Sequence, residues 1–252
     1  MKTILWNCRG LGGPSTVSQL KDAIRIHLPC FISISETKRN KFFTNTVFKK
    51  LGFADRRYTV EPEGSSGGLL LMWNTEVEIL QILSSNYCIQ VVFKRAKEES
   101  KEWLILVWRL KRSCGDFDKR GRSRSQRSCE KFNNFIGRIG MMEIKIEGYP
   151  FTWCNNRRDE GFVEEKLDRV FGSYSWLSAH KEAKVCTSYR SSSYHSMLIM
   201  DSGSSKSHFF KRFCFDKRWL SKRGCKEQVE KAWNSPVEGS MMFLLGSLYC
   251  TD

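Results

Sequence analysis

The first 38 residues constrain the fold most strongly, because two short apolar strands flank a segment with helical periodicity. The stretch TILWNCRG at 3–10 is typical of a strand that ends in a glycine-rich turn. Apolar residues then recur every three to four positions up to His27, which predicts a helix with Ser15 as its N-cap and Pro29 beyond its end. CFISISETK at 30–38 is a second, β-branched strand. This strand–helix–strand opening indicates an α/β fold with mixed or parallel pairing.

Polar residues of chemical interest follow several of the expected strands. Asn7 ends the first strand, Glu36 ends the second, and a short CGDFD stretch carries Asp116 and Asp118. Taken singly, each is more often a surface charge or a turn residue, but strand ends can converge at one edge of a sheet. Carboxylate and amide oxygens are hard ligands that suit Mg²⁺ or Mn²⁺. A metal held there could polarise a phosphoryl oxygen and position water.

Asp168 and His195 are a candidate carboxylate–imidazole pair. A carboxylate beside the ring would fix its tautomer. His195 stands in SSSYHSMLIM, where three serines lead into Tyr194 and an apolar run follows. A lone histidine at such a border is more often structural, so the pair gains meaning only together with the other strand-end residues.

The middle of the chain predicts a short helix over 40–52 and then four successive strands, which indicate a meander. A very basic stretch, 109–138, comes next and includes an amphipathic helix near its end. YPFTWCN at 149–155 predicts an aromatic strand, whereas 163–173 has both strand and helix character.

The charge balance favours a polyanionic partner. The chain has 42 Lys and Arg against 27 Asp and Glu, a net charge of +15. Nucleic acid is the first candidate and an anionic membrane surface the second, although a solvated basic loop would explain 109–138 equally. No apolar run is long enough to span a bilayer or to form a signal-peptide core, which favours an intracellular protein. The ten cysteines include no Cys-x-x-Cys pair, so no zinc spacing is present.

Seven stretches in order resemble the endonuclease/exonuclease/phosphatase family, and in particular the apurinic-type endonuclease domain of plant LINE-type (non-LTR) retrotransposons. They are WNCRGLGGP (6–14), SETK (35–38), GSSGGLLLMW (64–73), GDF (115–117), GYPFTWCNNR (148–157), EEKLDRVFGSYSW (164–176) and SSSYHSMLI (191–199). FCFDKRWL (213–220) resembles the segment that follows this domain in such polyproteins, so the similarity covers about residues 1–233.

The resemblance implies a four-layered α/β sandwich, two mixed β-sheets flanked by helices, and divalent-metal-dependent cleavage of DNA phosphodiesters. It assigns the domain to 1–202 and a C-terminal extension to 203–252. By the same resemblance Glu36 holds Mg²⁺ or Mn²⁺ and Asp168 orients His195. The remaining implied roles are catalytic for Asn7, Asp116 and Asp118 and substrate-binding for Arg9, Trp153 and Asn155. It also implies a monomer that acts on DNA in the nucleus.

Three departures from the family's pattern bear on activity. Tyr194 stands where the family has the Asp of SDH, and a neutral phenol cannot replace that charge. Asp118 stands where the family has Asn, and a carboxylate only accepts hydrogen bonds. Only RLKRSC separates WLILVW from GDF, too few residues for a parallel crossover, which predicts an internal deletion near 108–115.

Three function classes stay open on these grounds. The first is a Mg²⁺-dependent endonuclease with weak or no remaining activity. The second is a non-catalytic basic nucleic-acid-binding fragment, favoured by the net charge and by Tyr194. The third is a phosphatase of the same fold, which fold alone does not exclude.

Overall fold

The computed structural model describes most of the chain in two compact units. They are Met1–Ser205 and Lys206–Asp252. The described residues are 1–51, 56–64, 66–95, 98–108, 119–120, 127–157, 159–188, 193–203 and 224–233. Asp116, Asp118 and the proposed deletion site lie outside them, and the division into 1–202 and 203–252 stays a prediction. In the second unit the described helix is α5 (Cys225–Trp233).

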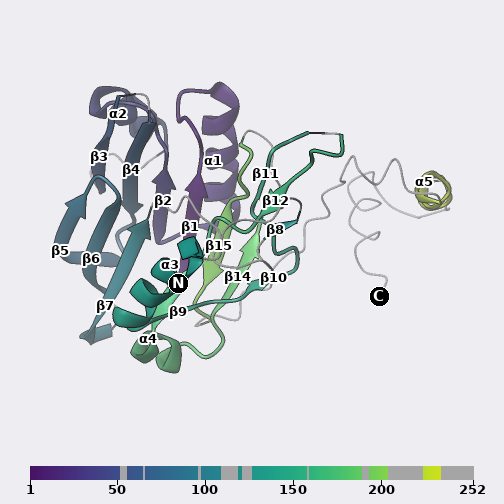
Figure 1. Ribbon diagram of the computed structural model, residues 1–252. Coiled ribbons are helices and arrows are strands. Elements are labelled where there is room, and N and C mark those ends of the chain that lie inside the picture. Colours follow the sequence, from purple (N-terminus) through teal and green to yellow (C-terminus); the bar gives the residue numbers. More distant parts are fainter. Residues whose placement is uncertain are drawn as a thin grey trace, which may run out of the picture. The chain divides into compact units, whose positions relative to one another are not determined.

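A seven-stranded mixed sheet forms the centre of the first unit (Figure 1). Its strands, in spatial order, are β10 (Ile146–Glu147), β14 (Lys184–Thr187), β15 (Leu198–Asp201), β1 (Lys2–Asn7), β2 (Phe31–Ser35), β4 (Ser66–Trp73) and β3 (Arg57–Glu63). β1 runs parallel to β2 and antiparallel to β15. The mixed or parallel pairing predicted from the strand–helix–strand opening is therefore confirmed.

Two helices cover one face of this sheet. α1 (Pro14–His27) connects β1 to β2, and α2 (Lys41–Leu51) follows β2. Their apolar sides bury a core with alternate residues of the strands, including Ile4, Leu20 and Phe48. The predicted N-cap was wrong: α1 begins after Gly13 without a side-chain cap, because Pro14 occupies the first turn. Proline is pre-organised for that position and has no N–H to satisfy.

The opposite face packs against a second layer. An antiparallel sheet of β5 (Val77–Ser85), β6 (Cys88–Arg95) and β7 (Glu98–Trp108) lies there, and so does the pair β9 (Met141–Glu143) and β13 (Phe171–Ser173). α3 (Arg127–Arg138) and α4 (Tyr174–Ala179) belong to this part of the fold. One buried cluster joins Phe31 of β2 to Phe93 of β6. The predicted α/β sandwich is confirmed.

The predicted four-stranded meander was wrong. β4 pairs with β2 and β3 in the central sheet, and only β5, β6 and β7 form a meander. The reason is burial, since Leu69, Leu70, Leu71 and Met72 are all fully buried. Such a strand must be covered on both faces. In the central sheet the helices cover one face and the second layer covers the other.

The segment expected as a long aromatic strand is mostly loop. Only β11 (Trp153–Cys154) is strand, and it pairs with β12 (Glu164–Glu165), which in turn pairs with β8 (Lys119–Arg120). Among the described residues, no helix is long and apolar enough to cross a membrane.

Two glycines near the connection of β3 to β4, Gly64 in the turn and Gly68 in β4, offer a matched test of backbone strain. Gly64 (φ +59) has open space where a Cβ would stand, whereas a Cβ on Gly68 (φ +83) would lie 2.1 Å from the Thr37 hydroxyl oxygen. We expect Gly64→Ala to lower the free energy of unfolding by about 1–2 kcal/mol, the cost of a left-handed backbone. Gly68→Ala should lose a further 1–3 kcal/mol or so from overpacking.

Urea denaturation of both variants measures the two losses. Equal losses would contradict the close packing of Gly68 against the loop that follows β2.

Candidate active site

The ends of β1 and β2 bring two predicted site residues to one edge of the sheet. Asn7 lies opposite Ser35 in the parallel register, and Glu36 follows directly. The Cys8 amide donates to the Ser35 carbonyl over 3.1 Å, so the two chains remain joined as they leave the sheet. Asn7 and Glu36 thus lie on neighbouring strand ends although they are 29 positions apart in the chain (36 − 7 = 29).

The two side chains have different surroundings. Asn7 is 8% exposed, and its Oδ1 is buried without a hydrogen-bond partner. Glu36 is half-buried, and its Oε2 accepts a hydrogen bond of 3.1 Å from the Gly67 amide. An unpaired buried amide oxygen is unfavourable unless a ligand satisfies it. Asn7 therefore offers an oxygen to a bound group.

Backbone strain is concentrated in the same two loops. Five non-glycine residues of the described chain have a positive φ, and three of them are Arg9 (φ 50), Glu36 (φ 56) and Lys38 (φ 52). Such conformations cost of order 1–3 kcal/mol each and persist where the surrounding structure enforces them. The strain fits a role for this edge in binding or chemistry.

Asp168 and His195 form a direct hydrogen bond. Asp168 Oδ2 lies 2.7 Å from His195 Nδ1, with 18% and 6% of the two side chains exposed. An ionised carboxylate only accepts hydrogen bonds, so Nδ1 carries the proton and donates it. This arrangement fixes the ring and leaves Nε2 for another partner.

Thr152 holds the backbone that presents Asp168. Its hydroxyl oxygen accepts from the Leu167 amide at 3.0 Å and from the Asp168 amide at 2.8 Å. Thr152 is fully buried, and its own carbonyl accepts from the Ser196 amide at 2.6 Å. One threonine therefore links the segment of Asp168 to the segment of His195.

Ser193 links the histidine to the end of β1. Its hydroxyl donates to the Asn7 carbonyl over 2.9 Å, and the same oxygen accepts from the His195 amide at 3.1 Å. The Trp6 indole N–H also donates to the His195 carbonyl over 3.4 Å. These bonds bring the Asp168–His195 pair beside Asn7 across 186 positions of sequence.

The residues expected to contact substrate fall into two groups. The Arg9 guanidinium lies 5.2 Å from the centre of the Tyr194 ring, and Trp153 is bridged to His195 with ring centres 6.5 Å apart. Asn155 instead holds its own loop, because its amide donates to the Gly161 carbonyl and accepts from two backbone amides. A substrate contact by Asn155 stays a prediction.

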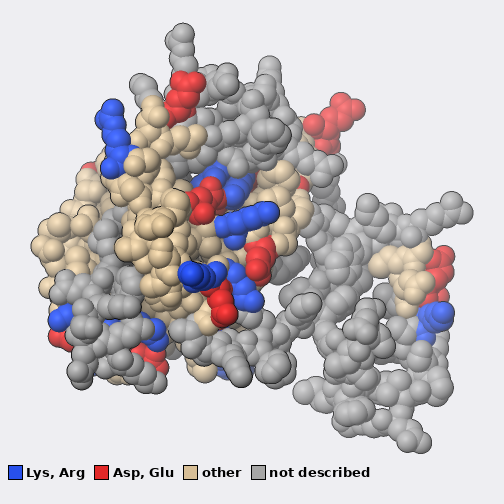
Figure 2. Space-filling model, turned by 90° about the horizontal axis from the view of Figure 1, so that it is seen from below, with Lys and Arg blue, Asp and Glu red and all other residues tan. Residues whose placement is uncertain are grey.

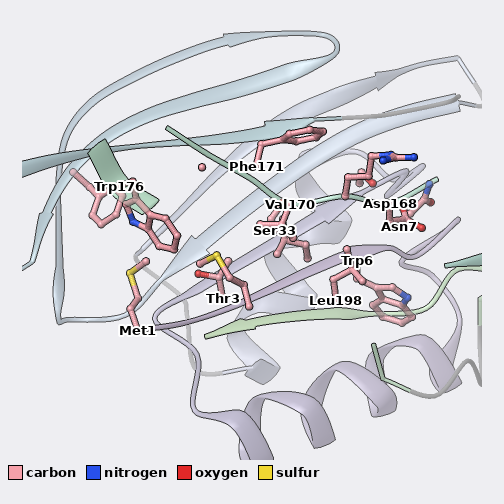
Figure 3. Close-up of a pocket in the computed structure, with 16 residues that line it drawn as sticks. Met1, Thr3, Trp6, Asn7, Ser33, Asp168, Val170, Phe171, Trp176 and Leu198 are labelled. Carbon is pink, nitrogen blue, oxygen red and sulfur yellow. The ribbon is translucent and has the colours of Figure 1, made fainter. Parts of the chain in front are cut away.

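A pocket of about 80 Å³ runs inward from this edge between the two layers. Asn7 and Asp168 lie at one end, and Met1 and Trp176 lie at the other (Figure 3). The lining between them is mainly apolar and includes the buried Thr3, whose hydroxyl has no partner. The hydrogen-bonding groups of the site therefore lie at one end of a mostly apolar cavity.

The candidate metal ligands at this edge are few, but their oxygen atoms suit a hard cation. Among the described residues no group of three or more His, Cys, Asp or Glu could hold a metal ion. The Asn7 Oδ1 and the Glu36 carboxylate are hard oxygen donors at one edge, which suits Mg²⁺ or Mn²⁺. Mg²⁺ usually keeps several waters and takes one or two carboxylates, so this small set fits it.

Charges on the described surface are mixed. On the face that Figure 2 shows, basic and acidic side chains alternate instead of separating into two areas. Elsewhere in the described residues, Lys166 and the buried Arg169 both pair with Glu143. The positive net charge is therefore not concentrated on that face of the described residues.

Two positioning residues were missed from the sequence. Thr152 and Ser193 make their site contacts through hydroxyl groups to backbone atoms of distant segments. Both residues lie inside stretches that carry the family resemblance, GYPFTWCNNR for Thr152 and SSSYHSMLI for Ser193, and that context is the signal that could have drawn attention to them.

Solved structures of DNA-processing proteins share this architecture, although no family model and no curated protein matches the sequence. An AP endonuclease from Leishmania major has a TM-score of 0.61 at 14% identity, covering 79% of this chain and 86% of that one. A 3′ phosphatase from Neisseria, solved with a product DNA hairpin, has a TM-score of 0.56 at 12% identity, covering 80% and 98%.

A retrotransposon protein belongs to the same group. The endonuclease domain of TRAS1, a telomere-specific non-LTR retrotransposon, has a TM-score of 0.52 at 10% identity, covering 79% of this chain and 97% of that one. At such identities the likeness shows the fold. The first unit therefore has the α/β sandwich fold found in endonuclease/exonuclease/phosphatase proteins.

Thr152 can be tested with an isosteric substitution. Thr152→Val keeps the shape but leaves the Leu167 and Asp168 amides without an acceptor. We expect a loss of about 1–3 kcal/mol per orphaned amide in the free energy of unfolding by urea denaturation. Thr152→Ser keeps the hydroxyl and should lose less than half as much. Similar losses for both variants would show that the hydroxyl does not hold this segment.

Cys8 gives a prediction for high pH. Burial raises the pKa of its thiol from 9.0 to about 12. The folded state then keeps a proton that the unfolded state loses, so this contribution to stability is complete below pH 9 and falls as the pH rises toward 12. Between pH 8 and 10.5 the parent should lose more stability than Cys8→Ala.

Alkylation provides an independent measurement of the burial of the Cys8 thiol. At pH 8 the thiolate fraction of Cys8 in the folded chain should be about a thousandfold below that of the unfolded chain. Peptide mapping after iodoacetamide should find Cys8 modified only on unfolding. Fast modification in the folded protein would contradict its burial.

Proposed function

We propose that the chain is a degenerate, divalent-metal-dependent DNA endonuclease of the retrotransposon type, with weak remaining activity. The observation that carries the proposal is the hydrogen bond between Asp168 and His195, anchored beside Asn7 through Ser193. The endonuclease and phosphatase structures that share the fold support phosphodiester cleavage as its chemistry.

Each described residue has a distinct role in this proposal. Asn7 and Glu36 would hold Mg²⁺ or Mn²⁺, which when bound polarises a phosphoryl oxygen and lowers the pKa of water. His195, fixed through Nδ1 by Asp168, presents Nε2 as a hydrogen-bonding group for a phosphoryl oxygen. Arg9 adds a positive charge for the phosphodiester backbone.

Asp116 and Asp118 complete the proposed site from outside the described residues. Asp116 would position or activate the attacking water. Asp118 lacks the amide donor of the family's asparagine and adds negative charge beside the substrate, which opposes binding. Together with Tyr194 it is the reason that we propose weak activity.

Partner and location follow from the same proposal. DNA is the proposed substrate, and the 3′ phosphatase from Neisseria that has this fold and was solved with a product DNA hairpin supports it. We propose a monomer, and the nucleus as the place of action, because that is where chromosomal DNA lies.

Plasmid nicking tests the enzymatic part. In Mg²⁺ the parent should convert supercoiled plasmid to open circles slowly, and EDTA should abolish the conversion. Glu36→Ala should reduce the rate by at least about a hundredfold, since losing one transition-state contact typically costs 10²–10³. Glu61→Ala, which removes an exposed carboxylate of β3, is the matched control and should nick like the parent.

Restoring the family's residues sharpens the test. Tyr194→Asp combined with Asp118→Asn should raise nicking at least tenfold if these two departures limit the rate. Vigorous nicking by the parent would contradict degeneracy. If neither the parent nor the restored variant nicks the plasmid, the endonuclease proposal is rejected. The second candidate function, a non-catalytic nucleic-acid binder, is then favoured. Tyr194, which replaces the family's Asp, also favours that candidate.

A further inference from the structure

We propose that Tyr194 and Arg9 form a stacking platform for an unstacked nucleobase beside the candidate active site. This inference rests on the proposed nucleic-acid substrate and names the part of that substrate that the site would bind. Tyr194 is 46% exposed, so its ring is accessible to a flat ligand. Arg9 is also exposed, and its guanidinium lies 5.2 Å from the ring centre.

The backbone beneath Tyr194 is held on both sides. The Tyr194 carbonyl accepts from the Cys154 amide over 3.2 Å. Ser193 is bonded to the Asn7 carbonyl, and His195 is bonded to Asp168. The ring is therefore carried on an ordered segment, and binding a flat partner requires little further ordering of the backbone.

The chemistry of the pair suits a base. Aromatic rings and arginine planes both stack on nucleobases, and stacking tolerates any sequence because every base has a π face. Arg9 covers the ring from one side, so the pair presents a flat, positively charged surface. A carboxylate at position 194 would instead repel phosphates, so the substitution that weakens catalysis supplies a contact for a base.

The location of the platform defines its ligand further. Tyr194 adjoins His195 in sequence, and Trp153, half-buried, is bridged to His195. A base in a duplex is covered on both faces and cannot stack on a protein ring. The platform therefore favours single strands, or a base displaced from a duplex, over paired DNA.

Binding in EDTA separates this inference from cleavage. Fluorescence anisotropy with the full chain would compare oligo-dT of eight nucleotides with an eight-unit abasic oligomer of equal phosphate charge. Stacking predicts that oligo-dT binds about 5- to 150-fold more tightly than the abasic oligomer. Tyr194→Leu should remove that preference, whereas Tyr194→Phe should keep it.

Arg9→Lys keeps the charge but loses the plane, so it should weaken the preference for oligo-dT with little change in abasic binding. Duplex DNA of the same length should bind the parent more weakly than oligo-dT. Oligo-rU distinguishes the source of the base: tighter binding than oligo-dT indicates RNA, and equal or weaker binding indicates DNA.

The inference is overturned if the abasic oligomer binds as tightly as oligo-dT, or if Tyr194→Leu keeps the preference. Circular dichroism confirms that each variant is folded. A preference for oligo-dT without nicking would support the stacking platform and reject the endonuclease. Nicking without that preference would support the endonuclease and reject the stacking platform.

Discussion

The parallel pairing of β1 with β2 is the constraint on which the rest of the structure depends. These strands lie in the middle of the seven-stranded sheet and carry buried residues on both faces. Ile4 and Ile32 pack toward the helices, whereas Phe31 packs toward the second layer. Because the strands are parallel and in register, their carboxyl ends meet, and Asn7 and Glu36 reach the same edge.

The second half of the candidate site is attached to this edge both by the pairing of β15, which follows His195, with β1 and by side-chain hydrogen bonds. Ser193 bonds to the Asn7 carbonyl, and Thr152 bonds to the amide of Asp168. The Asp168–His195 hydrogen bond then joins the two segments that carry these residues. The geometry of this half therefore depends on single hydroxyl groups in addition to the sheet, whereas the geometry of the β1 and β2 ends depends on the sheet.

Tyr194 links the two proposals for this site, since it would weaken catalysis and would strengthen the binding of a base. It removes a negative charge that the family's pattern has beside the histidine, and it places an exposed ring under Arg9. A site with fewer effective catalytic groups and tighter binding of a base would bind nucleic acid tightly but cleave it slowly. Such a shift would turn the proposed endonuclease into a nucleic-acid binder without a change of fold.

The sequence by itself determined the parallel opening of the fold, the helix that follows β1, and the candidates Asn7, Glu36, Asp168 and His195. Local apolar periodicity is sufficient for the strands and the helix, whereas the candidates needed their residue types, their places at strand ends and the family resemblance together. Only the tertiary structure decided that β4 leaves the meander for the central sheet, that Gly13 and Pro14 begin α1, and that Arg9 lies over Tyr194. The physical reason is that burial on a second face, and hydrogen bonds across more than a hundred residues, depend on partners that no local pattern contains.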